Sequence, residues 1–297
     1  MKNRFACRIR ASTFALFAAC GSTGSLAITV NIDQYTVVRD SSILFNDTFS
    51  DGAPPPSAPS FVTGAAASYA VFGTIPVGAE SSGVLQLDSA NGGLTGNAVS
   101  DPRLQVAALL VTGTTGATAL GIGNVLEQSG TFSLSVPTGP DFSGYGIRFT
   151  DSFAGIVNQF AQLFVGWSVA SMAPVISYVL QDFVADTVTA LGSTVLAAPS
   201  GADQIRLTLT RPSAANNNFF GSFSYLSGGL VVSGGSFNTP GVLFQGETFV
   251  RGQFFAAQAI PIAAAIPEPE TYAMLLGGLG LLGWVGRRRK VRRARRT

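Results

Sequence analysis

Short runs in which every second residue is apolar recur through the central part of the chain. The clearest are 131–136, 145–150 and 204–210. A period of two residues is typical of strands that bury one face. Clusters of Gly, Pro, Asn, Asp and Ser bound most runs, as in Pro137-Thr138-Gly139-Pro140 and Ser227-Gly228-Gly229. The predicted strands lie near 28–38, 43–49, 69–75, 84–88, 104–112, 131–136, 145–150, 160–168, 175–183, 187–196, 204–210, 218–226, 229–233 and 248–258. Their spacing predicts an all-β fold, an antiparallel β-sandwich.

One segment fits two structures. The apolar residues of 175–191 also recur at helical spacing, with Pro174 at a suitable first turn and Gly192 at a suitable end. Its many β-branched residues and the turn-forming pair Ala185-Asp186 favour a β-hairpin. We expect the hairpin, and a helix here would leave the fold class unchanged.

The N-terminus has the three parts of a secretory signal peptide, predicted over 1–27. Basic residues open it, an apolar stretch runs from Ala11 to Ala19, and small residues lead to Ser25-Leu26-Ala27. An alternative is lipidation of Cys20, since Phe17-Ala18-Ala19-Cys20 resembles a lipoprotein cleavage site. The Leu usual at the position of Phe17 is missing, so ordinary cleavage is favoured.

The C-terminus predicts a linker (260–270), a transmembrane helix (271–286) and a cytoplasmic basic tail (287–297). A helix over 271–286 is about 24 Å long, short of a hydrocarbon core of about 30 Å. Basic flanking side chains can extend to the membrane surface and cover the difference. The stop-transfer residues are Arg287, Arg288, Arg289 and Lys290, and Tyr272 and Trp284 suit the two interfaces.

Composition excludes several kinds of chemistry. The chain has 297 residues, no His and two Cys, and both of these, Cys7 and Cys20, precede the strands. The strand region therefore has no histidine-based catalysis, zinc site or disulfide framework. It also has no Gly-x-Ser-x-Gly elbow and no phosphate-binding glycine loop.

Charge is divided unevenly between the ends and the body. Twelve of the 18 basic residues lie at the two ends, whereas residues 28–266 hold six arginines, no lysine and fourteen acidic residues. An acidic body cannot neutralise a run of phosphates, so we expect no nucleic-acid partner. The basic ends are accounted for by membrane topology.

Pro267, Glu268 and Pro269, the Leu/Gly-rich segment after them and the terminal Arg cluster resemble the PEP-CTERM sorting signal of Gram-negative bacteria. This resemblance implies an exported protein that is anchored transiently in the inner membrane and processed by exosortase near the motif. After processing it would reach the cell surface or the extracellular matrix. Such systems usually accompany exopolysaccharide and biofilm production, so exopolysaccharide is an expected partner of the body.

The order of strands in the body resembles a concanavalin A-like jelly roll. The segments that carry this resemblance are 45–52, 83–87, 145–149 and 203–209. It implies two packed sheets in one domain over residues 28–259. The catalytic signature of the jelly-roll glycosidases, a strand that carries paired glutamates, is missing from this sequence.

The remaining candidates for chemistry are carboxylates and aromatic rings. Asp47 and Asp51 are candidate calcium ligands, since oxygen ligands suit calcium, although solvated turn carboxylates explain them as well. We expect no other cofactor. The candidate stacking residues for a sugar are Trp167, Phe219, Phe220 and Tyr225, and core packing is the competing explanation for them. Asn216-Asn217-Asn218 forms a polar loop in front of Phe219.

These observations favour a noncatalytic structural or carbohydrate-binding role for the body. Two alternatives stay open. One is a carboxylate-dependent enzyme that modifies polysaccharides, with Glu80, Glu127 and Glu247 as the available glutamates. The other is a self-associating surface protein.

Overall fold

The structure is a computed structural model, and it describes residues 27–57, 68–95, 103–112, 119–121, 123–138, 143–151, 159–182, 187–242 and 249–259. Apart from one 3-10 turn, η1 (Ser89–Asn91), all regular structure in these residues is strand, which confirms the all-β class. None of the helical structure described there is long and apolar enough to cross a membrane. The predicted signal peptide and transmembrane helix lie outside the described residues.

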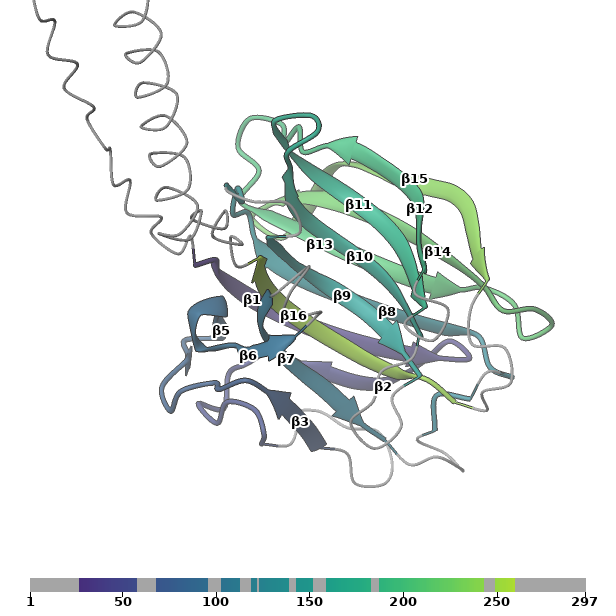
Figure 1. Ribbon diagram of the computed structural model, residues 1–297. Helices are drawn as coiled ribbons and strands as arrows, with labels where there is room; N and C mark the ends of the chain where they lie inside the picture. The colour runs from purple at the N-terminus through teal and green to yellow at the C-terminus, as the bar shows by residue number, and fades with distance from the viewer. Residues whose placement is uncertain are drawn as a thin grey trace, which may run out of the picture.

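The strands form two antiparallel sheets that pack face to face (Figure 1). Sheet A has the order β15-β14-β13-β8-β1-β5-β4, with β2 paired to β1. Its strands are β1 (Thr29–Arg39), β2 (Ser42–Asp47), β4 (Glu80–Ser81), β5 (Val84–Asp88), β8 (Leu126–Ser133), β13 (Gln204–Arg211), β14 (Asn218–Ser227) and β15 (Leu230–Val242).

Sheet B has the order β12-β11-β10-β9-β16-β7-β3, with β6 paired to β7, and it faces the viewer in Figure 1. Its strands are β3 (Ser68–Phe72), β6 (Gly93–Thr95), β7 (Arg103–Val111), β9 (Gly144–Thr150), β10 (Gln159–Ser168), β11 (Ala173–Asp182), β12 (Thr187–Val195) and β16 (Arg251–Ala259). The sandwich as predicted from the sequence is confirmed, and its jelly-roll connectivity stays a prediction.

The core lies between the two sheets and is built by alternation along each strand. Ile205, Leu207 and Leu209 of β13 are fully buried, as their period of two predicts. Phe254 of β16 has ring contacts at 5.0 Å to Tyr35 and 5.8 Å to Phe49. Aromatic rings from both sheets therefore meet at the centre of the sandwich.

The predicted hairpin over 175–191 is confirmed. β11 and β12 pair antiparallel from Val175 to Asp182 with one bulge, and residues 183–186, which hold the predicted turn, lie outside the described residues. The next predicted turn is also present: Gly228 and Gly229 have φ angles of 55° and 81° between β14 and β15. Two consecutive positive φ angles are typical of a tight hairpin turn, and glycine adopts them without strain.

Two strands are longer than the alternation predicts. β8 begins at Leu126 rather than near 131, because Gln128 on its polar stretch is buried and accepts a hydrogen bond from the Tyr35 hydroxyl at 2.8 Å. β15 continues to Val242 through Gly234, Gly235 and Pro240. An edge strand pairs on one side only, so it tolerates residues that would interrupt a central strand.

Candidate functional site

The structure places the four predicted stacking residues in different surroundings. Phe219 and Tyr225 are buried, with exposed fractions of 1% and 3%. The Phe219 ring packs against Phe149 at 5.6 Å, and the Tyr225 hydroxyl accepts a hydrogen bond from the Ala197 amide at 3.1 Å. Both therefore serve the core and offer no free ring face.

The other two aromatic candidates are half-buried and lie on separate sheets. Trp167 lies near the end of β10 in sheet B, where its amide donates to the Ser143 carbonyl at 3.1 Å. Phe220 pairs with Thr210 in sheet A and follows the buried Phe219. The structure does not gather the four predicted rings into one platform.

The polar loop 216–218 has a structural role. Arg211 at the end of β13 is buried, and its Nη2 donates to the Asn217 Oδ1 at 3.1 Å and to the Ala214 carbonyl at 3.4 Å. The Asn216 side chain accepts from the Asn218 amide at 3.1 Å. Asn217 thus helps to satisfy a buried cation, which explains a polar loop at this place.

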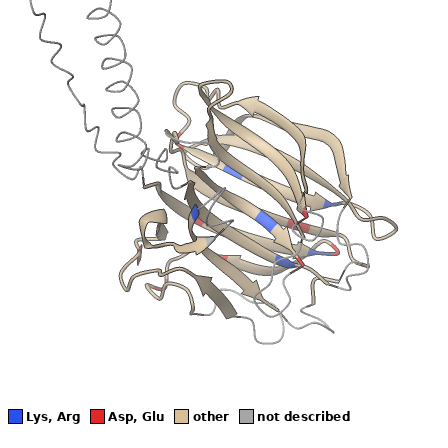
Figure 2. Ribbon diagram, viewed as in Figure 1, with Lys and Arg blue, Asp and Glu red and all other residues tan. Residues whose placement is uncertain are grey.

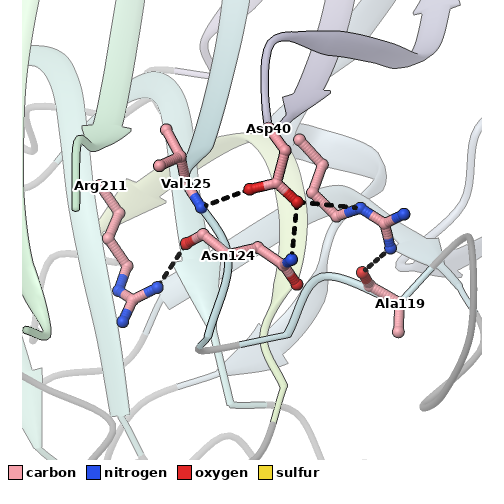
Figure 3. A network of polar contacts seen from close by, with 6 residues as sticks. Asp40, Ala119, Asn124, Val125 and Arg211 are labelled. Carbon is pink, nitrogen blue, oxygen red and sulfur yellow. Dashed lines mark hydrogen bonds and ion pairs between the residues drawn. The ribbon is translucent and has the colours of Figure 1, made fainter. Parts of the chain in front are cut away.

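Arg211 also belongs to a network at one end of sheet A (Figure 3). Its Nη1 donates to the Asn124 carbonyl. Asp40, in the turn after β1, accepts from the Val125 amide at 2.9 Å and the Asn124 side-chain amide at 2.7 Å. The ion pair of Asp40 with Arg39 is long, 3.8 Å, and partly exposed, so it adds little stability. The hydrogen bonds, and not the ion pair, therefore hold the loops of this network together.

The predicted calcium residues, Asp47 and Asp51, make hydrogen bonds within the protein. Asp47 is 5% exposed and accepts from the Phe49 amide at 2.9 Å and the Tyr69 hydroxyl at 3.2 Å. Asp51 accepts from the Ala53 amide at 3.0 Å. No group of three acidic side chains suited to a metal ion occurs in the part of the chain that the structure describes.

Glu80 of β4 lies beside Asp51. It is 4% exposed, its Oε1 accepts from the Gly52 amide at 2.9 Å, and its carboxyl shares a hydrogen bond with that of Asp51. Burial is the main cause that raises the pKa of Glu80 to about 7, followed by the contact with Asp51. A hydrogen bond between two carboxyl groups needs one proton, so this contact holds the loop after β2 against β4 below about pH 7, where Glu80 is protonated.

Polar side chains that we did not predict as site residues lie on the outer face of sheet B, which we call the front face. On this sheet every second side chain points away from the sandwich core. The polar and aromatic residues at the outward positions of its four central strands are Arg103, Gln105, Arg148, Thr150, Phe160, Gln162, Phe164, Arg251, Gln253 and Phe255. The front face therefore carries arginines, amides and phenyl rings together, and most of them are buried, whereas Arg103 and Arg251 are half-buried.

Arg148 lies at the centre of the front face. It pairs across the sheet with Gln162 on one side and Gln253 on the other, and its Nε donates to the Gln253 Oε1. Its guanidinium carbon lies 5.1 Å from the centroid of the Phe160 ring and 5.2 Å from that of Phe255. Two rings and an amide thus orient the guanidinium group.

The charge on the front face is of one sign. No Asp or Glu occupies a described outward position of sheet B, and Figure 2 shows a basic segment in the middle of this sheet. Burial, with repulsion from Arg103, lowers the pKa of Arg148 to about 9. Arg251 lies diagonally beside Arg148, and burial lowers its pKa as well. Arg148 stays charged at neutral pH and is 8% exposed, so an anion at this face would first meet the half-buried Arg103 and Arg251 beside it.

Arg148 could not be identified as a site residue from the sequence, because its neighbours come from strands far apart in the chain. The alternation in 145–150 shows only that Arg148 faces away from the core. That Phe160, Gln253 and Phe255 surround it depends on the strand order, in which β9 pairs with both β10 and β16.

The predicted sorting residues Pro267, Glu268 and Pro269 and the stop-transfer residues Arg287 to Lys290 lie outside the described residues, so their assignment comes from sequence. Residues 265–290 match the PEP-CTERM protein-sorting motif, as predicted. No curated protein matches the chain by sequence.

One similar solved structure is the CBM2 module of the evolved Dit protein of Lactobacillus casei BL23 phage J-1. It has a TM-score of 0.36 and 12% sequence identity, and the match covers 76% of this chain and 90% of that one. A likeness at this level carries no argument about function. The motif does: residues 265–290 carry a PEP-CTERM protein-sorting motif, which implies export, processing by exosortase and a place at the cell surface.

Proposed function

We propose that the exported β-sandwich is a noncatalytic carbohydrate-binding module of the cell surface or extracellular matrix, and that it binds an acidic polysaccharide on its front face. The observation that carries this proposal is Arg148, a cation held between two phenyl rings on a face without described carboxylates. The rings of Phe160 and Phe255 are buried, at 4% and 3% exposure, so they orient Arg148 and do not stack on a sugar; the proposed recognition is by charge.

The choice of an acidic polymer follows from charge. The body as a whole is acidic, with fourteen acidic residues against six arginines in 28–266, and would repel a polyanion. Three of those six arginines, Arg103, Arg148 and Arg251, occupy the front face. A carboxylate of a uronic acid is a planar partner for a guanidinium group.

A noncatalytic role fits the surroundings of the best candidate acid. Glu80 has a raised pKa, which is common at active sites. Its carboxyl, however, is nearly inaccessible and is engaged by the Gly52 amide and by Asp51. We therefore assign Glu80 to the stability of a loop and propose no hydrolytic step.

Binding to polygalacturonate tests the proposal on the exported protein recovered from cells. We expect retention on this polymer, weaker binding at high salt, and weaker binding to the same polymer after methyl esterification, which removes the carboxylates. Arg148→Gln is expected to lower the affinity by about tenfold to a hundredfold, the range for losing one charged hydrogen-bonding partner. Affinity electrophoresis in gels containing the polymer measures the change.

Arg206→Gln is the matched control, because it removes the same charge from sheet A instead of sheet B. Arg206 donates a hydrogen bond to the Thr131 hydroxyl at 3.3 Å. It should bind as the wild type does. An Arg148→Gln protein with the wild-type melting temperature and undiminished binding would reject the front face as the site. No retention on polygalacturonate or on the organism's own exopolysaccharide would reject the binding function.

The sorting route is tested separately, by intact mass and cell fractionation with and without exosortase. We expect loss of the segment beyond Pro267-Glu268-Pro269, and release from the inner membrane, only when the enzyme is present. A full-length product retained in the membrane of both strains would instead indicate a permanent single-pass anchor.

A further inference from the structure

The two sheets end on one side in long strands that carry no charge. β15 closes sheet A and β12 closes sheet B, and neither contains Asp, Glu, Lys or Arg. Their neighbours β14 and β11 add a single charged residue, Asp182. In Figure 2 this side of the sandwich is almost free of charged positions.

The same side concentrates exposed aliphatic side chains. The exposed fractions are 56% for Val188 and 54% for Val195 on β12, and 75%, 60% and 49% for Leu230, Val231 and Val232 on β15. Within the described residues no strand pairs with the outer side of either β12 or β15. Backbone donors and acceptors and aliphatic side chains therefore meet along one edge.

The opposite edges are built differently. β4, which closes sheet A at its other end, has two residues, and β3, which closes sheet B, has five. Short edge strands prevent pairing with other chains, as do charged side chains on an edge. β15 has thirteen residues and β12 has nine, without a charge in either. Of the features that usually prevent an edge strand from pairing with another chain, β12 and β15 show only bulges and Pro240.

The two long edges lie side by side, as Figure 1 shows. The Phe237 ring of β15 packs directly over Gly192 of β12, so closely that a Cβ atom on Gly192 would lie 2.3 Å from it. Between its two bulges β15 keeps a regular stretch from Ser233 to Phe237. The edge is thus ordered and continuous across both sheets.

We propose that this edge joins two copies of the chain, with β15 pairing antiparallel to β15 of the second copy across a two-fold axis and β12 packing beside it. A strand edge is complementary to itself under such an axis, because each residue that donates on one copy meets its acceptor on the other. An uncharged edge suits a second copy in particular, because neither β12 nor β15 carries a charge that the same strand of a second copy would repel.

Cysteine cross-linking of the full chain in cell membranes and in the exported fraction tests the pairing. The sequence has only Cys7 and Cys20, both before the sandwich, so wild type reports their background. Ser233→Cys and Ser236→Cys lie at exposed positions of β15, and the one nearer the two-fold axis should form a disulfide-linked dimer on mild oxidation, because only a residue at the axis lies opposite itself. Ser82→Cys, in the exposed turn between β4 and β5, is the matched control and should remain monomeric.

A second change separates pairing from random collision. Val232→Lys, added to whichever of the two β15 cysteine variants cross-links, is expected to reduce the dimer at least about tenfold, because it places a charge against an apolar edge. Val77→Lys adds the same charge at a fully exposed loop position and should leave the dimer unchanged. Absence of dimers at both β15 cysteines, equal cross-linking at Ser82, or a dimer insensitive to Val232→Lys would each overturn the proposal.

Discussion

Replacing Phe254 by alanine is expected to lower the free energy of unfolding by about 3–5 kcal/mol, the usual cost of removing a buried phenyl ring. Phe254 is fully buried and its ring contacts Tyr35, Phe49 and Tyr69 at 5.0, 5.8 and 5.6 Å. Tyr35 belongs to sheet A, whereas Tyr69 and Phe254 belong to sheet B. The ring therefore joins the two layers, and its loss leaves a cavity that neither rigid sheet can close.

Urea unfolding of the exported protein, followed by circular dichroism, measures this loss as a shift of the midpoint by about 1 M or more. Phe72→Ala is the matched control, since it removes the same atoms from a ring that is 40% exposed on β3. We expect the control to lose less than half as much stability. Equal losses in the two variants would show that Phe254 does not hold the sheets together.

The fold was largely predictable because alternation is a local signal. Ile205, Leu207 and Leu209 show in one short segment which face is buried, and the structure buries all three. The signal fails where a polar residue is buried by a distant partner, as with Gln128 of β8 and the Tyr35 hydroxyl. It fails also at β15, where pairing on one side allows Gly234, Gly235 and Pro240 within a strand.

The site was less predictable, because its chemistry depends on residues brought together by strand order. Aromatic side chains looked alike in sequence, and alternation alone could not tell that Phe219 packs in the core at 1% exposure whereas Phe220 is half-buried on sheet A. Arg148 can be recognised as a site residue only from the strand order, in which β10 and β16 lie on either side of β9. The sorting motif is the opposite case, since a linear signal of Pro267-Glu268-Pro269 and a basic tail is read directly from sequence.

Replacing Glu80 by glutamine is expected to stabilise the protein at alkaline pH and to leave it unchanged in acid. The folded state raises the pKa of Glu80 from 4.5 to about 7, through burial and through the neighbouring carboxyls of Asp51 and Asp47. Folding thus favours the protonated form. Its contribution to stability is complete below pH 4.5 and is lost as the pH rises through about 7.

A shift of this size corresponds to at most about 3 kcal/mol of stability lost by the wild type between about pH 4.5 and pH 8, and solvent screening of the carboxyl lowers this figure. Glutamine stays neutral across this range and keeps an oxygen that can accept from the Gly52 amide. Urea unfolding at pH 5 and pH 8 should therefore show the Glu80→Gln protein equal to wild type at the lower pH and more stable by about 1–3 kcal/mol at the higher.

Glu127→Gln makes the same change at an exposed position of β8 and controls for the loss of a negative charge. A Glu80→Gln protein whose stability follows the wild-type pH profile would show that Glu80 does not gain a proton on folding.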